Sequence, residues 1–336
     1  MPVFAAALTN KTRLYKIKYN SCIQSRGNMI QQIQKKAYAK INLGLDVLRR
    51  RPDGYHEVKM IMQTVDLFDR LTICKSEQPG ITFTMEAEGQ AVTSLVPVDD
   101  TNLVCKAARK LIEKYPIKEG VHFVLQKNIP VAAGMAGGST DAAAALVGMN
   151  ELFDMQLSVE ELQKIAVTIG ADVPYCVVGG TALSEGIGEK LTRLTAPPQC
   201  GLVIVKPAVS VSTRYVYENL HVETLEHHPD IDGMVEALQT GNLAGITERM
   251  ENVLERVTVK EYPLIARVKE NLETLGAKKA LMSGSGPTVF GVFEDATEAK
   301  AAAEAMEQSI LKKNGQITQI IATGFYEPDN YGKEQE

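Results

Sequence analysis

A run of small residues in the first half of the chain has the composition of a phosphate-binding loop. Glycine lets the backbone approach a ligand closely, and the first N–H groups of a helix favour an anion. The run leads into an alanine-rich stretch that predicts a helix over 142–153. A triphosphate needs several N–H donors without obstructing side chains, so we expect phosphate binding here. The loop consists of Pro130, Val131, Ala132, Ala133, Gly134, Met135, Ala136, Gly137, Gly138, Ser139 and Thr140.

The loop matches neither of two common nucleotide motifs. No Gly-Lys-Ser/Thr follows it, as a Walker loop would require, and Gly134, Gly137 and Gly138 do not have the G-x-G-x-x-G spacing. The alternative is a flexible turn capped by Ser139. We favour phosphate binding, because a turn does not need so many small residues.

Asp172 is the candidate general base. It is flanked by small and apolar residues in 170–174, and a partly desolvated carboxylate beside a cation suits proton abstraction. The alternative is an Asx turn or helix cap. Asp141 is a rival carboxylate, expected in the first turn of the helix after the loop. The helix dipole stabilises a charge there, which suits structure or metal handling better than proton abstraction.

Lys40 and Asn42 form a polar pair in an otherwise apolar segment. The pattern of 37–48 predicts a strand, and side chains two residues apart lie on the same face of a strand. Together they could serve a hydroxyl and a phosphate. The alternative is that this face of the strand is open to solvent.

Strands and helices are mixed along the chain rather than strictly alternating, which indicates an α+β fold in layers. We expect an extension over 1–35, an N-terminal domain over 36–196, a C-terminal domain over 197–327 and a tail over 328–336. Strands are expected at 37–48, 58–65, 70–74, 81–85, 122–126, 202–205, 288–293 and 317–325. Helices are expected at 102–115, 142–153, after Ser158, and near 231–238, 242–255, 261–275 and 296–309. Asp100 or Thr101 is the expected cap of the helix at 102.

Composition narrows the classes of function. The chain has 336 residues and a net charge of −5. This charge argues against general affinity for nucleic acid or anionic membranes, and the absence of an apolar run of about 18 residues predicts no membrane helix. Five scattered cysteines without C-x-x-C argue against a disulfide framework or thiolate zinc site and are typical of a reducing compartment.

The N-terminal segment is basic. Residues 1–36 contain seven basic residues and no acidic one, while Met29 could begin the same protein. An upstream start codon is therefore our preferred interpretation, with a disordered tail or a targeting segment as alternatives.

Four ordered motifs together resemble the superfamily of galactokinase, homoserine kinase, mevalonate kinase and phosphomevalonate kinase, over residues 36–327. Within it, the sequence of 51–57, Arg-Pro-Asp-Gly-Tyr-His-Glu, resembles the signature of the family that phosphorylates the 2-hydroxyl of diphosphocytidyl methylerythritol, a step of the non-mevalonate isoprenoid pathway. The four motifs are Lys36–Leu45, Pro130–Ala143, Gly170–Pro174 and Ser283–Pro287.

The resemblance implies a two-domain α+β fold with an active site in the cleft between the domains. It implies ATP and Mg²⁺ as cofactors, with the metal ligands unassigned. Asp172 would be the catalytic base, Lys40 its partner, and 130–140 the ATP loop. The 283–287 segment, otherwise a strand-connecting turn, would close the other side of the cleft. The implied substrate contacts are Asn42, Tyr55, His56, Asn102, Thr213 and Tyr217.

The implied roles of Tyr55 and His56 make chemical sense. A tyrosine ring stacked on a pyrimidine contributes about 1–3 kcal/mol. A histidine in a fixed tautomer can hydrogen-bond the edge of the base. The alternative is a hairpin turn with an exposed aromatic residue.

The phosphate loop departs from the family pattern, which often has glycine where this chain has Ala132, Ala133, Met135 and Ala136. Alanine restricts φ, so nucleotide affinity could differ. Met135 is expected to cover the nucleotide or to pack in the core.

Two rival functions remain open. Another kinase of the superfamily, acting on homoserine or mevalonate, would have no need of Tyr55 and His56. A non-catalytic nucleotide- or RNA-binding module would not need Lys40 with Asp172, and the acidic pI argues against it. We expect a cytoplasmic monomer or homodimer whose partners are ATP and a small-molecule substrate, with no nucleic acid or membrane.

Overall fold

The computed structural model describes residues 32–86 and 96–328, so the predictions for 1–31 and 329–336 lie outside the described residues. The first half of the chain builds a six-stranded sheet in the order β3-β4-β2-β5-β6, with β1 paired to β2. Only β3 and β4 are parallel. The strands are β1 (Gln32–Arg50), β2 (His56–Ser76), β3 (Ile81–Glu86), β4 (Gly120–Gln126), β5 (Thr181–Gly186) and β6 (Lys190–Arg193).

The second half builds a four-stranded sheet in the order β10-β7-β9-β8. Its strands are β7 (Gly201–Pro207), β8 (Lys279–Met282), β9 (Val289–Phe293) and β10 (Ile317–Gly324). The chain passes from the first sheet to the second between Arg193 and Gly201, and the predicted domain boundary at 196/197 lies in this connection. The mixture of helices and strands confirms the α+β class, while the division into two domains stays a prediction.

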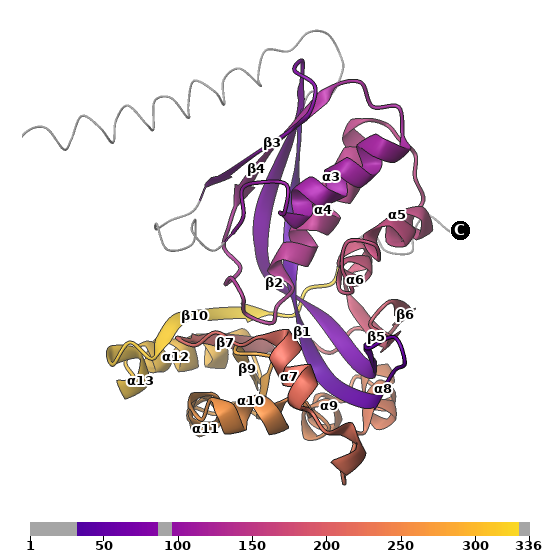
Figure 1. Ribbon diagram of the computed structural model, residues 1–336. Helices are drawn as coiled ribbons and strands as arrows, with labels where there is room; N and C mark the ends of the chain where they lie inside the picture. The colour runs from indigo at the N-terminus through magenta and orange to yellow at the C-terminus, as the bar shows by residue number, and fades with distance from the viewer. Residues whose placement is uncertain (1–31, 87–95, 329–336) are drawn as a thin grey trace, which may run out of the picture.

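Helices cover both sheets. Figure 1 shows α3 and α4 lying against the first sheet and α10–α13 beside the second. The helices of the first half are α3 (Leu103–Lys114), α4 (Gly137–Leu152), α5 (Val159–Ala166) and α6 (Val173–Val178). Those of the second half are α7 (Thr213–Asn219), α8 (Ile231–Gln239), α9 (Leu243–Glu248), α10 (Glu255–Glu261), α11 (Leu264–Thr274), α12 (Ala296–Glu307) and α13 (Ile310–Lys313), with a 3₁₀ turn at Val222–Thr224. No described helix has the length and apolar character that crossing a membrane requires.

The long β1–β2 hairpin connects the two halves. Its pairing shifts register between Tyr38 and Lys40 and again between Asn42 and Gly44. Irregularities of this kind bend a strand and re-aim its side chains. They flank the two polar residues that the sequence singles out, so the hairpin presents Lys40 and Asn42 at its bend.

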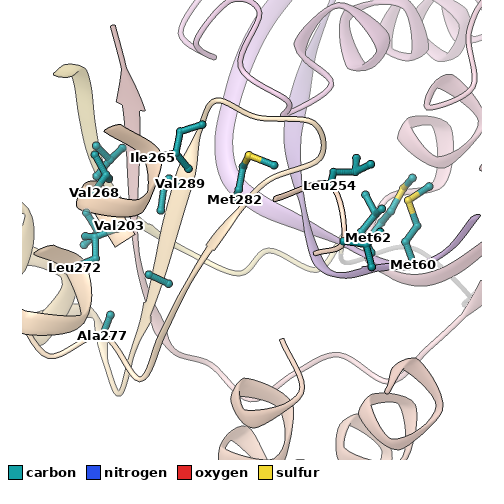
Figure 2. Close-up of a cluster of buried hydrophobic side chains, with 14 of the residues drawn as sticks. Met60, Met62, Val203, Leu254, Ile265, Val268, Leu272, Ala277, Met282 and Val289 are labelled. Atoms are coloured by element: carbon teal, nitrogen blue, oxygen red, sulfur yellow. The ribbon is translucent and has the colours of Figure 1, made fainter. Parts of the chain in front are cut away.

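One hydrophobic cluster contains residues of both halves (Figure 2). Met60 and Met62 on β2 belong to the same cluster as Val203 on β7, Met282 on β8 and Val289 on β9. All five are buried. The two sheets therefore share this cluster, while a second cluster lies between the first sheet and its own helices and contains no residue of the second half.

Several element predictions differ from the structure. The two strands predicted at 58–65 and 70–74 are one strand, β2, in which Asp69 is fully buried. The helix predicted at 242–255 ends already at Glu248 as α9, and a further helix, α10, begins at Glu255. Asn102, not Asp100 or Thr101, caps α3. β1 begins at Gln32, so residues 32–35 of the predicted extension already pair with β2.

Candidate active site

A cavity of about 1280 Å³ brings the predicted site residues together. It is lined by the phosphate loop and the start of α3, and by the turn after β1 and α7. Lys40, Asn42 and Asp172 also line it. The predicted site residues that line it are Lys40, Asn42, Tyr55, His56, Asn102, 130–139, Asp172, Thr213 and Tyr217, and Thr140 is the one loop residue outside the lining.

Lys40 and Asp172 face each other. The Lys40 ammonium lies 3.8 Å from Asp172 Oδ2 and donates a hydrogen bond of 2.8 Å to Asn42 Oδ1. The Lys40 side chain is only 5% exposed, whereas that of Asp172 is 34% exposed. The lysine is thus buried in the cavity wall, while the carboxylate of Asp172 is accessible to a ligand in the cavity.

Asp172 is free to act as a base. It occupies the residue before α6, yet its side chain makes no capping hydrogen bond. The alternative that it serves as a helix cap is therefore wrong. Tyr175, one turn further along α6, donates to the carbonyl of Gly180 at 2.6 Å and lies 3.0 Å from Thr64 Oγ1. These bonds anchor α6, and with it Asp172, to the first sheet.

The phosphate loop has the backbone of an anion site. Ala132, Gly134 and Ala136 have φ of 51°, 73° and 57°, so the left-handed region recurs at every second residue. α4 begins at Gly137, five residues earlier than predicted, and no side chain caps it. Ser139 lies inside the helix, so the interpretation of this residue as the cap of a turn is wrong. The helix N-terminus is thus open to an anion.

The loop packs tightly on the Ser283–Pro287 turn. Ser283 Oγ donates to the carbonyl of Gly134 at 3.0 Å, and a Cβ on Gly134 would lie 2.3 Å from the carbonyl oxygen of Ser283. Met135 is 1% exposed and belongs to the core, so it packs and does not cover a ligand. Gly284 and Ser285 of the turn line the cavity next to the loop, and closure of the other side of the cleft by this turn stays a prediction.

Three aromatic side chains also line the cavity: Tyr55, His56 and Tyr217. Tyr55 is 59% exposed at the tip of the β1–β2 turn. The rings of His56 and Tyr217 lie 5.2 Å apart at 38°. Burial lowers the pKa of His56 below its ordinary value, with the nearby charge of Arg50 acting in the same direction. A neutral imidazole has one donor and one acceptor nitrogen, as recognition of a base edge requires.

Two further predicted contacts have structural partners of their own. Asn102 caps α3: its Oδ1 accepts from Val104 N at 2.8 Å, and its Nδ2 donates to the carbonyl of Pro97 at 2.6 Å. Thr213 Oγ1 lies 2.7 Å from Ser285 Oγ, which connects α7 to the Ser283–Pro287 turn. Substrate contact by either residue stays a prediction.

Asp141 belongs to a buried charged cluster beside the loop, and its partners Asp69 and Lys127 were not predicted from the sequence. Lys127 Nζ donates to Asp69 Oδ2 and, at 3.0 Å, to Asp141 Oδ2. Asp141 lies beyond the first turn of α4, and its pKa is raised to about 8, mainly by burial. The expectation that a helix dipole stabilises its charge is therefore wrong. The sequence signals for this cluster were Asp141 itself and Lys127, three residues before the loop.

The comparisons with known proteins agree with this geometry. Residues 102–180 match the model of the GHMP kinases N terminal domain, and 234–312 match that of the GHMP kinases C terminal domain. By fold and by site, the chain is thus a GHMP kinase.

Relatives that are similar over most of the chain show which family of GHMP kinases this chain belongs to. A 4-diphosphocytidyl-2-C-methyl-D-erythritol kinase of Lachnoclostridium phytofermentans is 49% identical over 298 residues, which cover 89% of this chain and 99% of the relative. A crystal structure of 4-(cytidine 5'-diphospho)-2C-methyl-D-erythritol kinase matches with a TM-score of 0.71 and 31% identity, over 88% of this chain and all of that one. The chain belongs to the family of 4-diphosphocytidyl-2-C-methyl-D-erythritol kinases.

A homoserine kinase from Cytophaga hutchinsonii has the same TM-score, 0.71, at 20% identity, over 89% of this chain and 96% of that one. At that identity the likeness shows the shared fold alone.

Proposed function

We propose that this chain transfers the γ-phosphate of ATP to the 2-hydroxyl of 4-diphosphocytidyl-2-C-methyl-D-erythritol. One observation carries the proposal: a single cavity is lined by the phosphate loop, by the His56–Tyr217 ring pair and by Lys40 with Asp172. A substrate that combines a cytosine ring with an alcohol to be phosphorylated fits these three groups.

The residues support phosphoryl transfer by positioning and charge. The hydroxyl oxygen forms a new bond to the γ-phosphorus, the bond to the β–γ bridging oxygen breaks, and ADP leaves. The hydroxyl proton goes to Asp172. The Lys40 ammonium beside Asp172 stabilises the negative charge that develops on the oxygen.

Mg²⁺ fits this site as the companion of ATP. Within 32–86 and 96–328, no three His, Cys, Asp or Glu side chains gather into a metal site. Mg²⁺ usually keeps several waters and is bound largely by substrate phosphates. The backbone of 130–140 would hold the triphosphate that carries it, and bound Mg²⁺ would neutralise phosphate charge. A cytoplasmic location and a monomer or homodimer remain part of the proposal.

The test is ADP release by the purified protein with Mg-ATP and each of three alcohols in parallel: the cytidylyl substrate, homoserine and mevalonate. Turnover with the cytidylyl substrate alone supports the proposal. Turnover with homoserine or mevalonate would keep the kinase and remove the cytosine assignment. No turnover with any alcohol, from folded protein, would favour a nucleotide-binding module.

A further inference from the structure

Three charged side chains lie together beside the phosphate loop, and two of the residues, Lys127 and Asp141, also line the cavity. Lys127 and Asp141 have side chains only 4% exposed, and that of Asp69 is fully buried. The Lys127 ammonium is shared between the two carboxylates. These three residues are called the Asp69–Lys127–Asp141 cluster below. None of them is needed for the proton transfer described above.

The cluster is bonded to both ends of the phosphate loop. Asp69 Oδ1 accepts from the backbone N–H of Asn128 at 2.5 Å and of Ile129 at 2.8 Å, directly before Pro130. Asp141 lies on α4, just after the loop ends. Lys127 therefore connects the residues before the phosphate loop to the helix after it, and so fixes the distance between the two ends of the loop.

The lysine also limits what can stand at the start of α4. A Cβ on Gly137 would lie 2.9 Å from Lys127 Nζ, so the ammonium sits against the first residue of the helix. A cation near a helix N-terminus is unfavourable. The two carboxylates offset the unfavourable charge of the ammonium. The N–H groups at the start of α4 therefore remain available on the cavity side for phosphate.

Two carboxylates and one ammonium leave an excess negative charge in a buried position, which is costly. Asp141 Oδ1 is buried and has no hydrogen-bond partner among the described residues. A proton on Asp141 removes the excess charge. The protonated carboxyl group can also donate a hydrogen bond to Asp69. Burial and the Asp69 charge raise the pKa of Asp141 to about 8, although Lys127 lowers it. Cys176 on α6 also interacts electrostatically with Asp141, as well as with Asp172 and Lys40. Burial raises the pKa of the Cys176 thiol, so this thiol stays neutral.

We propose that Asp141 is a positioning residue for ATP: with Lys127 and Asp69 it holds the two ends of the phosphate loop at the separation that the triphosphate needs. The inference rests only on the ATP half of the proposed function. Because the cluster is neutral while Asp141 is protonated, ionisation above about pH 8 adds a buried negative charge beside the loop and weakens triphosphate binding.

The experiment measures the dissociation constant of a non-hydrolysable ATP analogue with Mg²⁺ by calorimetry, from about pH 6 to about pH 9.5. The wild-type affinity should fall about tenfold across pH 8. Asp141→Asn, whose amide has the shape of a protonated carboxyl, should stay tight and independent of pH. Asp141→Ala should bind about tenfold more weakly even at neutral pH.

The matched control is Glu151→Gln on the same helix. Glu151 also pairs with a lysine, Lys35, but is 51% exposed and outside the cavity lining. This variant should follow the wild type at every pH. Kinetics add a second readout: Asp141→Ala should raise KM for ATP and leave KM for the cytidylyl substrate within about twofold.

Three results would overturn the inference. Asp141→Ala could bind the analogue as tightly as the wild type. Asp141→Asn could keep the alkaline loss, which would place the titration on another group. Asp141→Ala could lose cytidine diphosphate binding equally, which would indicate general unfolding. Analogue binding does not depend on the acceptor alcohol, so failure of the cytosine assignment would leave this test intact.

Discussion

At the scale of single residues, Asp172 carries the clearest chemical prediction. Asp172→Asn should lower kcat about 10²–10⁴-fold, because the amide cannot take the hydroxyl proton. KM for ATP and the thermal midpoint should change little, since the side chain is 34% exposed and caps no helix. Steady-state kinetics and thermal unfolding measure both.

The control is Asp232→Asn. Asp232 also pairs with a lysine, Lys59, at 2.7 Å, but neither residue lines the cavity. Its kcat should equal that of the wild type. A kcat for Asp172→Asn within a few-fold of the control would remove Asp172 as the base.

His56 gives a prediction about pH. Its pKa lies below the ordinary value, so the ring is neutral at pH 7 and gains a proton only on further acidification. Protonation removes the acceptor nitrogen, so KM for the cytidylyl substrate should rise as pH falls through that pKa. KM for ATP should not follow. Initial rates from about pH 5 to about pH 8 measure both constants.

Two variants test the assignment to His56. His56→Gln keeps hydrogen-bonding groups without titrating and should flatten the profile. His122→Gln, on β4 and outside the cavity lining, should keep the wild-type profile. If KM for the cytidylyl substrate still rises at acid pH in His56→Gln, another group or the substrate itself is responsible for the rise.

The sequence predicted some site residues and missed others for a physical reason. Lys40 and Asn42 could be paired from the two-residue period of a strand, and the structure joins them by a hydrogen bond. Asp69 lies 58 residues from Lys127, and no local period connects them. A buried ion pair of that kind becomes visible only when the chain is folded.

At the scale of elements, the fit between the phosphate loop and the Ser283–Pro287 turn gives a third prediction. Gly134→Ala places a Cβ 2.3 Å from the Ser283 carbonyl oxygen, so one backbone must move. We expect a loss of about 3 kcal/mol or more in the free energy of unfolding, with weaker binding of an ATP analogue. Urea unfolding and calorimetry measure the two effects.

Gly315→Ala separates backbone strain from the clash. Gly315 has φ of 69°, close to the 73° of Gly134, but nothing lies within 4 Å of its Cβ position. The left-handed backbone alone should cost about 1–2 kcal/mol. Equal losses in the two variants would show that the contact with Ser283 has no effect on stability.

Element boundaries were hardest to predict where long-range contacts decide them. Because glycines are poor helix formers, the sequence predicted a start of α4 after Gly137 and Gly138, whereas the helix includes both residues. The break at 249–254 is held by Asn252, whose Nδ2 donates to the carbonyls of Met282 and Gly284 at 2.8 Å. Thirty or more residues separate these partners, so no local pattern indicates the break.

At the scale of the whole molecule, the two sheets are joined by more than one contact. The backbone N–H of Tyr326, just after β10, donates to the carbonyl of Thr64 on β2 at 3.0 Å. Thr323 Oγ1 donates to the carbonyl of Asp66 at 2.8 Å. The chain therefore returns from the second sheet to the first, and the cavity wall depends on both.

This joint architecture predicts cooperative unfolding, although the sequence indicates two domains. Met62 on β2 is fully buried in the cluster that contains Val203 and Val289 of the second sheet. Met62→Ala should therefore cost about 2–5 kcal/mol and weaken both sheets together. Urea unfolding followed by circular dichroism, with hydrogen exchange in strands of each sheet, should show one coincident transition.

Ile310→Ala is the control, because Ile310 is 67% exposed and leaves no cavity when it is truncated. It should change the free energy of unfolding by less than about 0.5 kcal/mol. Two separate transitions, or a loss from Met62→Ala confined to the strands of the first sheet, would mean that each half is stabilised independently. A single transition means that ATP and the alcohol substrate bind to walls of one cooperative unit, so that destabilising either sheet weakens binding of both.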